Sequence, residues 1–455
     1  MKQAITAARP CKISATSYLT TRGKGVAEIG MTLAAATRQV QQYLADNSLL
    51  PPAERWRRMH LFAACQAGES FAMTEVRAMV RHAVCELGLK VPGWGSDQLA
   101  EEVYRYAYGL DVLEDVYYDP EVDEIRINAP KEVYVQKRGR NMKANVNFKD
   151  DDHILKIVRR MILTDRVALT RSTPRVESVR ADGSRVTATM PPLSRSVTVV
   201  IRKHDTFKLT EENLIASGTL NRQLLDLLIT LVSCRANILI AGAAGSGKTS
   251  LLKFLCQYIH QRMRIVTLET DFELHLESHY PGRDIVALQE QADLGITLRE
   301  LFRTVLRYTP DIIIVGEARA EEAQEMLKAC LRGHEGSMGT IHSSSVAEAV
   351  ESMTQMVLEG GNSLPEASLR REVARAFNVV IQMYSDTVNG IKKVERVTEL
   401  IPTVDGVALN DLCVWRGQAG NYNKGQWEFP GSFSPRLLEK MHKFGRREAE
   451  TLVAG

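Results

Sequence analysis

The stretch at residues 238–259 constrains the fold more than any other part of the chain. A short apolar run at 238–241 leads into Gly-Ala-Ala-Gly-Ser-Gly-Lys-Thr at 242–249, which matches the P-loop pattern G-x-x-x-x-G-K-[ST] at every fixed position. Apolar residues then recur at helical spacing as far as Ile259. A strand, a glycine-rich turn and a helix in this order predict a nucleotide site at a helix N-terminus. A turn without a ligand would leave the Lys-Thr pair unexplained.

The predicted phosphate-binding residues form one continuous segment. Glycines allow successive backbone N–H groups to point inward at an anion. Lys248 is expected to reach the β- and γ-phosphates, and the Thr249 hydroxyl is expected to bind Mg²⁺. The cofactor-binding set is Gly242, Ala243, Ala244, Gly245, Ser246, Gly247, Lys248, Thr249 and Ser250.

Composition narrows the class of protein. The chain has 455 residues, of which 44% are hydrophobic and 25% charged, as is ordinary for a globular protein of two to four domains. The net charge of +3 gives no general basic field for nucleic acid. No apolar run approaches the length of a membrane span, and the N-terminus lacks an apolar signal core. Seven scattered cysteines without C-x-x-C spacing favour reduced thiols in a cytosolic protein.

Changes in periodicity divide the chain. We predict a helical N-terminal extension at 1–95, partly disordered at its start, and an α+β domain at 100–205. A linker is expected at 206–219, and a P-loop domain at 220–455 with a C-terminal subregion at about 390–455. Within the α+β domain, a helix is predicted at 151–163 with Asp151 or Asp152 as its N-cap. The alternation of strands and helices after 220 predicts a mostly parallel sheet covered on both faces.

Acidic residues follow two further predicted strands of that sheet. The apolar runs at 265–268 and 311–315 are followed by Glu269 and by Gly316-Glu317. Because ligands of parallel sheets lie at the carboxyl ends of the strands, both carboxylates should face the phosphates. One could orient an attacking water and one could bind the metal, and the spacing does not say which does which. Asp271 and Glu273 lie just behind Glu269.

A glycine- and histidine-rich stretch at 333–343 is typical of a loop and strand edge beside a ligand. Taken alone, His334 and His342 are more often core or surface residues than ligands. No cysteine or carboxylate pair lies near them at ligand spacing, so a zinc site is not expected.

Together, the order of these motifs resembles that of the type II/IV secretion ATPases, and most closely the CpaF subfamily, which drives tight-adherence pili and related secretion or conjugation machines. The resemblance covers about residues 100–445 and leaves residues 1–95 unmatched. Supporting stretches lie at 119–125, 134–140, 181–186, 190–192 and 201–203.

The resemblance implies a RecA-like core and assigns roles to the site residues. The P-loop becomes the Walker A site for ATP, Glu317 becomes the Walker B glutamate and a metal ligand beside Thr249, and residues 269–273 become an acidic box. His342 falls in a histidine box that couples the nucleotide state to subunit movement. Arginines of the preceding domain are implied at the phosphates, with Arg180, Arg185 and Arg202 as candidates.

Two positions depart from the family pattern. Glu269 is followed by Thr270, so that Asp271 comes one place late, which favours Glu269 as the functional carboxylate. Thr309 stands where an arginine is usual before the Pro-Asp of the Walker B strand, although Arg307 is close by.

The implied function is a hexameric ATP-hydrolysing motor that powers a pilus or a secretion or conjugation apparatus. It would be cytoplasmic and peripheral at the inner face of the cytoplasmic membrane, attached through a platform protein of the inner membrane. Two alternatives stay open: a nucleic-acid-stimulated RecA-like motor, and a nucleotide-binding assembly scaffold with low turnover. The chain lacks interleaved basic and aromatic residues, so direct nucleic-acid binding is not expected.

Overall fold

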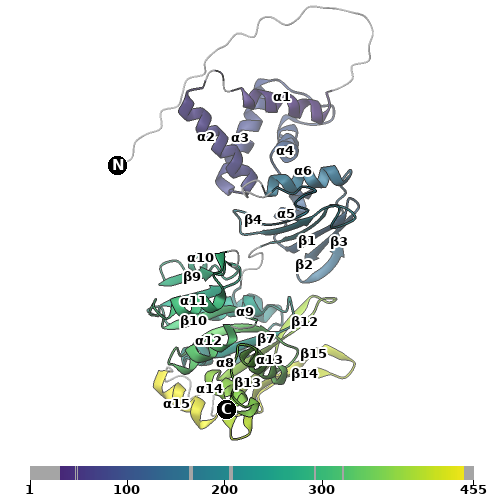
Figure 1. Cartoon of the computed structure of the whole chain (residues 1–455). Coiled ribbons are helices and arrows are strands. Elements are labelled where there is room, and N and C mark those ends of the chain that lie inside the picture. Colours follow the sequence, from purple (N-terminus) through teal and green to yellow (C-terminus); the bar gives the residue numbers. More distant parts are fainter. Residues whose placement is uncertain are drawn as a thin grey trace, which may run out of the picture. The chain divides into compact units, whose positions relative to one another are not determined.

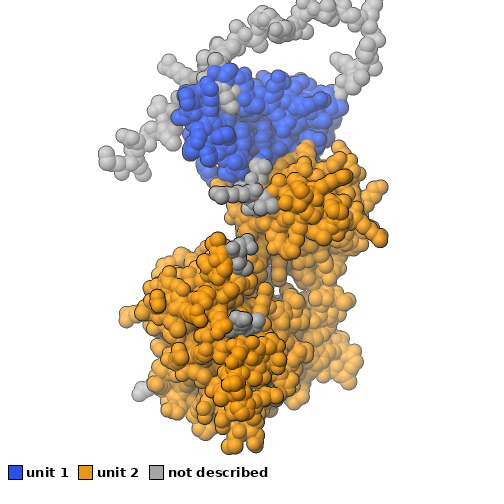
Figure 2. Space-filling view, viewed as in Figure 1, with its two compact units in different colours: residues 1–66, 70–111 blue, residues 67–69, 112–455 orange. Residues whose placement is uncertain are grey.

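The computed structural model describes residues 31–46, 48, 50–162, 168–203, 209–291, 294–319 and 322–444. The chain divides into two compact units, one of residues 1–66 and 70–111 and one of residues 67–69 and 112–455 (Figure 2). Within the described ranges, no helix is both long and apolar enough to cross a lipid bilayer. Five cysteines in this part of the chain are buried, and Cys85 is exposed.

Unit 1 is helical in its described part. Its helices are α1 (Leu33–Ala45), α2 (Pro52–Ala67), α3 (Ser70–Glu86) and α4 (Ser96–Ala107). Helices α1, α3 and α4 pack against one another around Val40, Val76 and Val103. Because α4 shares this core, the helical unit extends past the predicted boundary at residue 95.

Unit 2 begins with a six-stranded antiparallel sheet in the order β3-β2-β1-β6-β5-β4. Alternate residues of its strands, such as Val186 and Ile201, are buried on one face of the sheet. The helix predicted at 151–163 is present, but its N-cap is Asp150, whose side chain accepts a hydrogen bond from the His153 amide. The elements are a 3-10 turn (Asp111–Leu113), α5 (Glu114–Tyr118), β1 (Val122–Ala129), β2 (Glu132–Lys137), β3 (Arg140–Lys143), α6 (Asp151–Met161), β4 (Arg175–Val179), β5 (Arg185–Thr189) and β6 (Thr198–Arg202).

The second sheet of unit 2 has nine strands in the order β15-β14-β13-β12-β7-β11-β10-β8-β9 (Figure 1). Strands β12, β7, β11, β10, β8 and β9 are parallel, and β12 to β15 continue as antiparallel hairpins. The strands are β7 (Ile238–Gly242), β8 (Ile265–Glu269), β9 (Ile285–Gln289), β10 (Ile312–Ala318), β11 (Met338–His342), β12 (Val379–Asp386), β13 (Ile391–Thr403), β14 (Gly406–Gln418) and β15 (Asn421–Glu428).

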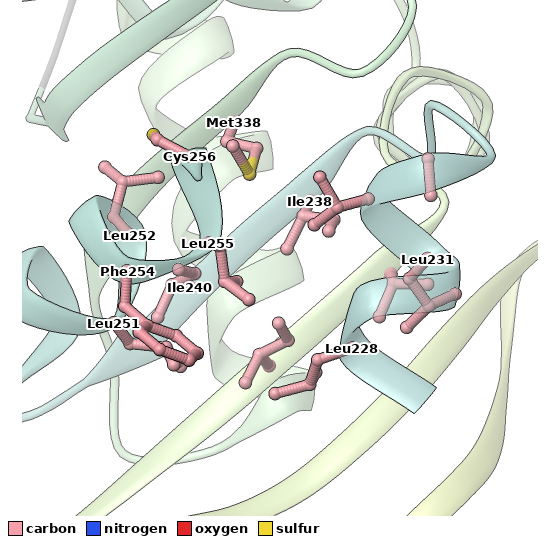
Figure 3. Packing of buried hydrophobic residues seen from close by; sticks show 14 of the residues in the cluster. Leu228, Leu231, Ile238, Ile240, Leu251, Leu252, Phe254, Leu255, Cys256 and Met338 are labelled. Atoms are coloured by element: carbon pink, nitrogen blue, oxygen red, sulfur yellow. The ribbon is translucent and has the colours of Figure 1, made fainter. Parts of the chain in front are cut away.

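Helices cover both faces of this sheet, as the run of buried residues in β7 requires. Ile238 and Ile240 pack with Leu228 and Phe254 on one face (Figure 3), whereas Leu239 belongs to the core on the other face. The helices are α7 (Glu211–Ala216), α8 (Arg222–Ser233), α9 (Lys248–Cys256), α10 (Leu276–His279), α11 (Leu298–Val305), α12 (Glu322–Leu331), α13 (Val346–Glu359), α14 (Glu366–Ala376) and α15 (Pro435–Phe444). The α/β class with a parallel P-loop core, an α+β domain before it and a helical N-terminal region is thus confirmed.

Two segments carry more structure than their sequence indicates. The segment interpreted as a linker contains helix α7, which is capped by Thr210. The strand-like pieces of the C-terminal subregion do not form a layer of their own. They extend the P-loop sheet, because β12 pairs directly with β7, and β13, β14 and β15 follow β12 in order toward the edge of the sheet.

Candidate functional site

The P-loop joins strand β7 to helix α9 through a turn that needs glycine. A Cβ atom at Gly242 would lie 2.6 Å from the Ser246 Oγ and 2.9 Å from the Met383 carbonyl oxygen. Gly245 and Gly247 have φ angles of 71° and 93°, in the left-handed region that side chains disfavour. Gly247 is also the N-cap of α9. The loop therefore curls tightly and presents the N-terminus of α9 at the carboxyl edge of the sheet, where an anion is stabilised.

Lys248 lies within this loop with its side chain turned back onto the backbone. Its Nζ donates hydrogen bonds to the carbonyl oxygens of Gly242 and Ala243, both at 2.9 Å, and lies 3.4 Å from the His342 Nδ1. Burial lowers the pKa of Lys248; Glu317 opposes this shift, and the charge of Arg202 adds to it.

Two features of the loop fit a bound phosphate. The Ser246 Oγ is fully buried and has no hydrogen-bond partner among the described residues. Lys248 is only 6% exposed and carries a charge that no carboxylate in the described part of the chain neutralises by direct contact. A phosphate group would supply an acceptor for the hydroxyl and the counter-charge for the ammonium group.

Glu317 connects the loop to the neighbouring strands. It lies in β10, accepts a hydrogen bond from the Arg319 guanidinium at 2.9 Å, and lies 3.1 Å from the His342 Nε2. Burial alone would raise the pKa of Glu317, but Arg319, His342 and Lys248 outweigh it, so the pKa is lowered. The carboxylate is therefore charged at neutral pH. Lys248, His342 and Glu317 form one continuous chain across the ends of β7, β11 and β10.

Glu269 is at the end of β8 but has a different environment. It is 2% exposed, its Oε1 accepts from the Thr267 hydroxyl at 2.9 Å, and its Oε2 accepts from the backbone amides of Glu273 and Leu274 at 2.7 and 2.8 Å. Burial raises its pKa, although these hydrogen bonds oppose the shift. Both oxygens are bonded within the protein, so this carboxylate holds the loop at 270–274 in place.

The exposed acidic residues of that loop meet the six-stranded sheet. The Arg185 Nη1 lies 3.1 Å from the Asp271 Oδ2 and 3.2 Å from the Glu273 Oε1, and its Nη2 donates to the Phe272 carbonyl at 3.4 Å. The hydrogen bond with Glu317 raises the pKa of Arg319, and the charges of Asp271 and Glu273 add to the effect. Arg319 and the carboxylates of Asp271 and Glu273 therefore lie close enough for their charges to interact.

Arg202 is the second arginine that the structure brings toward the P-loop. It lies directly opposite Arg185 in the β5–β6 pairing. Like charges in such a cross-strand pair are destabilising unless an anion lies between or above them. The effect of Arg202 on the pKa of Lys248 places its charge within range of the phosphate loop.

Arg180 lies elsewhere in the same domain. It is 4% exposed, stacks over the Tyr117 ring at 5.4 Å from the ring centroid, and lies against Gly68. Its Nε and Nη1 have no hydrogen-bond partner in the described ranges. The structure does not bring this side chain into contact with the P-loop.

The two histidines of the 333–343 stretch lie at opposite ends of β11. His342 is at the carboxyl end, beside Lys248, whereas the His334 Nδ1 contacts the Pro310 carbonyl oxygen at 3.1 Å before the strand begins. A five-residue strand is roughly 16 Å long, so only His342 can belong to the site. The described residues contain no cluster of three or more His, Cys, Asp or Glu side chains that could hold a metal ion.

Sequence reasoning did not assign a role to Arg319, although it lies two residues after Glu317 and is the guanidinium closest to it. The available signal was its position just past the end of β10, two residues after Glu317.

Comparison with known proteins finds a matching family and related sequences. Residues 108–401 match the family model described as "Type II/IV secretion system protein". A putative conjugal transfer protein of Mycobacterium tuberculosis is 27% identical over 288 residues, which cover 61% of this chain and 81% of that protein. The type IV secretion system protein VirB11 of Brucella suis is 26% identical over 319 residues, which cover 62% and 86%.

A crystal structure of the Brucella suis VirB11 ATPase in complex with sulphate is 25% identical, covers 63% of this chain and 96% of that one, and superposes with a TM-score of 0.36. The family match spans more than half of the chain and includes the P-loop, Glu317 and His342. The chain therefore belongs to the type II/IV secretion system protein family and is one of its ATPases.

Proposed function

We propose that this chain is the hexameric motor of a pilus or secretion apparatus, of the CpaF-like kind, and that it hydrolyses ATP at the P-loop of β7 and α9. The observation that carries the proposal is the chain of contacts from Lys248 through His342 to Glu317, at 3.4 and 3.1 Å. It links the phosphate loop after β7 to a charged carboxylate on β10, across the intervening strand β11.

Binding of the nucleotide would change the partners of Lys248. In this structure its ammonium group is bonded to the Gly242 and Ala243 carbonyl oxygens. Phosphate oxygens carry full negative charge and form stronger hydrogen bonds than neutral carbonyls. We therefore assign Lys248 to the β- and γ-phosphates, with the α9 N-terminus and the loop amides around them and the Ser246 hydroxyl among the donors.

Glu317 is the residue that we assign to the attacking water. Its lowered pKa keeps it ionised, and a carboxylate can accept a hydrogen bond from water and polarise it toward the γ-phosphate. His342 contacts both Glu317 and Lys248. A shift of Lys248 toward the phosphates would therefore change the position of His342 and its contact with the Glu317 carboxylate. This contact gives His342 a physical route for coupling nucleotide state to strand position.

Thr249 and Glu317 are the residues that would hold Mg²⁺, which would neutralise charge on the transferred phosphoryl group. Thr249 is half-buried at the start of α9, and Glu317 lies near the carboxyl end of β10, two strands from β7 in the sheet. A site that uses one hydroxyl, waters and phosphate oxygens suits Mg²⁺, which keeps most of its own water shell.

Arg202 and Arg185 are the candidates for the arginines that act on the transition state. Arg202 is in range of Lys248, and Arg185 is tied to Asp271 and Glu273 across the two sheets of unit 2. Charges on the six-stranded sheet that act on a nucleotide in the P-loop would couple hydrolysis to movement of one sheet relative to the other. Arg180, packed against Tyr117, is better placed to hold its hairpin. Glu269, with both oxygens bonded, is better placed to position the acidic loop.

The relatives indicate the setting. Conjugal transfer and type IV secretion proteins work on apparatus that crosses membranes, so we place this motor at the cytoplasmic face of the inner membrane, bound to a platform protein of that apparatus. Within the family, the CpaF-like assignment rests on the sequence resemblance.

The ring is tested by measuring mass in solution with and without a non-hydrolysable ATP analogue. We expect a hexamer that the analogue favours, and a turnover per subunit that rises with protein concentration. A strictly monomeric chain whose turnover does not depend on concentration would contradict the ring while leaving the ATPase assignment intact.

A further inference from the structure

The hairpin of β12 and β13 extends past the end of the P-loop strand. Strand β12 runs parallel to β7 in the sheet (Figure 1), and its Met383 pairs with Gly242, the first residue of the P-loop. Strand β7 ends at Gly242, whereas β12 continues to Asp386 before the chain turns and returns as β13 from Ile391. The hairpin therefore projects beyond the carboxyl edge of the sheet, beside the phosphate loop.

Lys392 lies on the face of this hairpin that meets the P-loop. It pairs with Ser385 of β12, which is two residues after Met383, so the three side chains lie on one face. The Lys392 Cδ and the Met383 Cε each lie 3.7 Å from the position that a Cβ atom of Gly247 would occupy. Gly247 is the N-cap of α9 and precedes Lys248. The Lys392 side chain therefore passes alongside the last turn of the phosphate loop.

The ammonium group of Lys392 has no direct counter-charge in the described part of the chain. It forms no hydrogen bond or ion pair with another described residue. Burial lowers the pKa of Lys392; the charge of Asp123 opposes this shift, and the charge of Arg202 adds to it. Burying an ammonium group without an acceptor costs free energy. An anion bound at this place would therefore be stabilised by Lys392.

Three cations approach the N-terminus of α9 from three parts of the chain. Lys248 comes from the P-loop, Lys392 from the β12–β13 hairpin, and Arg202 from the six-stranded sheet. The charge of Arg202 acts on the pKa of both lysines. The buried Ser246 hydroxyl of the same loop also lacks a partner within the described ranges. A bound polyanion would relieve the repulsion among the cations and would give the hydroxyl an acceptor.

The turn of the hairpin is held in place from two sides. The Asp386 Oδ1 accepts hydrogen bonds from the backbone amides of Val388 and Asn389, at 3.0 and 3.1 Å. From the six-stranded sheet, the Arg140 Nε donates to the Asn389 carbonyl oxygen at 2.8 Å. The backbone that carries Lys392 is thus ordered before any ligand binds, which reduces the entropy that binding would cost.

We propose that Lys392 is a second phosphate-binding lysine of the nucleotide site and contacts the α- and β-phosphates beside Gly247. This inference rests on the proposed ATPase function and adds a binding residue to it. In a P-loop, the backbone amides cradle the α- and β-phosphates, whereas the loop lysine reaches the β- and γ-phosphates. The position of Lys392 beside Gly247 therefore assigns it to the two phosphates that ATP and ADP share, and leaves the γ-phosphate to Lys248.

The competing role for Lys392 is a structural one, in which it only attracts Asp123 on β1. Asp123 has a partner of its own, since its Oδ2 accepts a hydrogen bond from the Gly139 amide at 3.2 Å. An asparagine at position 123 can still accept that hydrogen bond but carries no charge. Asp123→Asn therefore removes the attraction to Lys392 without touching the lysine, and it separates the two roles.

The test is calorimetric titration of the full-length protein with ADP and with a non-hydrolysable ATP analogue, in the presence of Mg²⁺. Lys392→Gln should raise the Kd for both nucleotides by about 10- to 100-fold, the range for a lost hydrogen bond to a charged group. The ratio of the two Kd values should not change. The KM for ATP should rise by the same factor with kcat unchanged, because the contact is made equally before and during phosphoryl transfer.

Three variants serve as controls. Lys392→Arg keeps the cation and should bind both nucleotides more tightly than Lys392→Gln. Asp123→Asn should bind them like the wild type. Lys424→Gln removes an exposed lysine of β15 and should also bind like the wild type. The melting temperature of Lys392→Gln should match that of the wild type, which shows that the loss of affinity does not come from unfolding.

Wild-type affinity in Lys392→Gln would overturn the assignment of Lys392 and leave the ATPase function intact. An equal loss of affinity in Asp123→Asn would also overturn it, because Lys392 would then act through the contact between the two sheets. A loss confined to the ATP analogue would contradict the assignment to the shared phosphates. Failure of the wild type to bind either nucleotide would overturn the proposed function, and this inference with it.

Discussion

Replacing Glu317 by glutamine should separate nucleotide binding from hydrolysis. The amide has the shape of the carboxylate and can still accept a hydrogen bond from Arg319, but it lacks the charge that polarises water. Loss of a catalytic acid-base group lowers the chemical step by about 10²- to 10⁴-fold. We therefore expect single-turnover phosphate release to fall by about 10²-fold or more.

The stability of Glu317→Gln should change little. Arg319 has 56% of its side chain exposed, and an exposed ion pair is worth about 0–1 kcal/mol. The rate effect is therefore several times larger in free energy than the folding effect, since 10²-fold corresponds to about 2.7 kcal/mol. Melting temperature and nucleotide affinity, measured with a fluorescent ATP analogue, should stay close to the wild type.

A matched control for this variant lies on α12. The Glu325 side chain is 19% exposed, close to the 25% of Glu317, and it pairs with Lys328 at 3.0 Å outside the site. Glu325→Gln should hydrolyse ATP at the wild-type rate. If the affinity of Glu317→Gln fell as steeply as its rate, Glu317 would act in binding or folding, and the assignment to the attacking water would be refuted.

Four further changes test other parts of the account. Arg202→Ala should slow turnover by about 10³-fold with an unchanged melting temperature, as expected for an arginine that acts on the transition state. Arg185→Ala should also slow turnover. Wild-type rates in both variants would exclude Arg185 and Arg202 from this role. Gly242→Ala should abolish nucleotide binding, because its Cβ would lie 2.6 Å from the Ser246 Oγ, whereas Gly95→Ala, where a methyl group meets nothing within 4 Å, should bind normally in the same titration. A chain that begins at residue 112 should still bind ATP in a fluorescence titration, and an insoluble product would show that residues 1–111, which comprise unit 1 and the 67–69 segment of unit 2, are needed for folding.

The parts of the fold that the sequence predicts are those with a local signal. The P-loop, the strands of the central sheet and the helix at 151–163 depend on residues that are adjacent in the chain. The pairing of β12 with β7 joins residues about 140 positions apart, and no local pattern encodes it. For this reason, the sequence predicts a C-terminal subregion of the P-loop domain at about 390–455 without indicating which strand its own strands pair with.

The sequence predicts which strand ends carry the site, but it does not predict which side chains there take part in it. Glu269 and Glu317 occupy equivalent places after parallel strands, yet one is bonded to backbone amides and the other faces His342. Burial decides between them, and burial depends on how the loop at 270–274 folds back. The arginines show the same limit, since Arg180 and Arg202 have similar strand contexts and only packing against Tyr117 separates them.

Phosphate release by the purified protein, compared between wild type and Lys248→Ala, tests the central claim most directly. Because Lys248 is the buried cation of the P-loop, its loss should lower ATP hydrolysis by on the order of 10²-fold or more. Lys328→Ala removes a lysine outside the site and should hydrolyse ATP like the wild type. Wild-type hydrolysis by Lys248→Ala would show that the P-loop of β7 and α9 is not where this protein hydrolyses ATP.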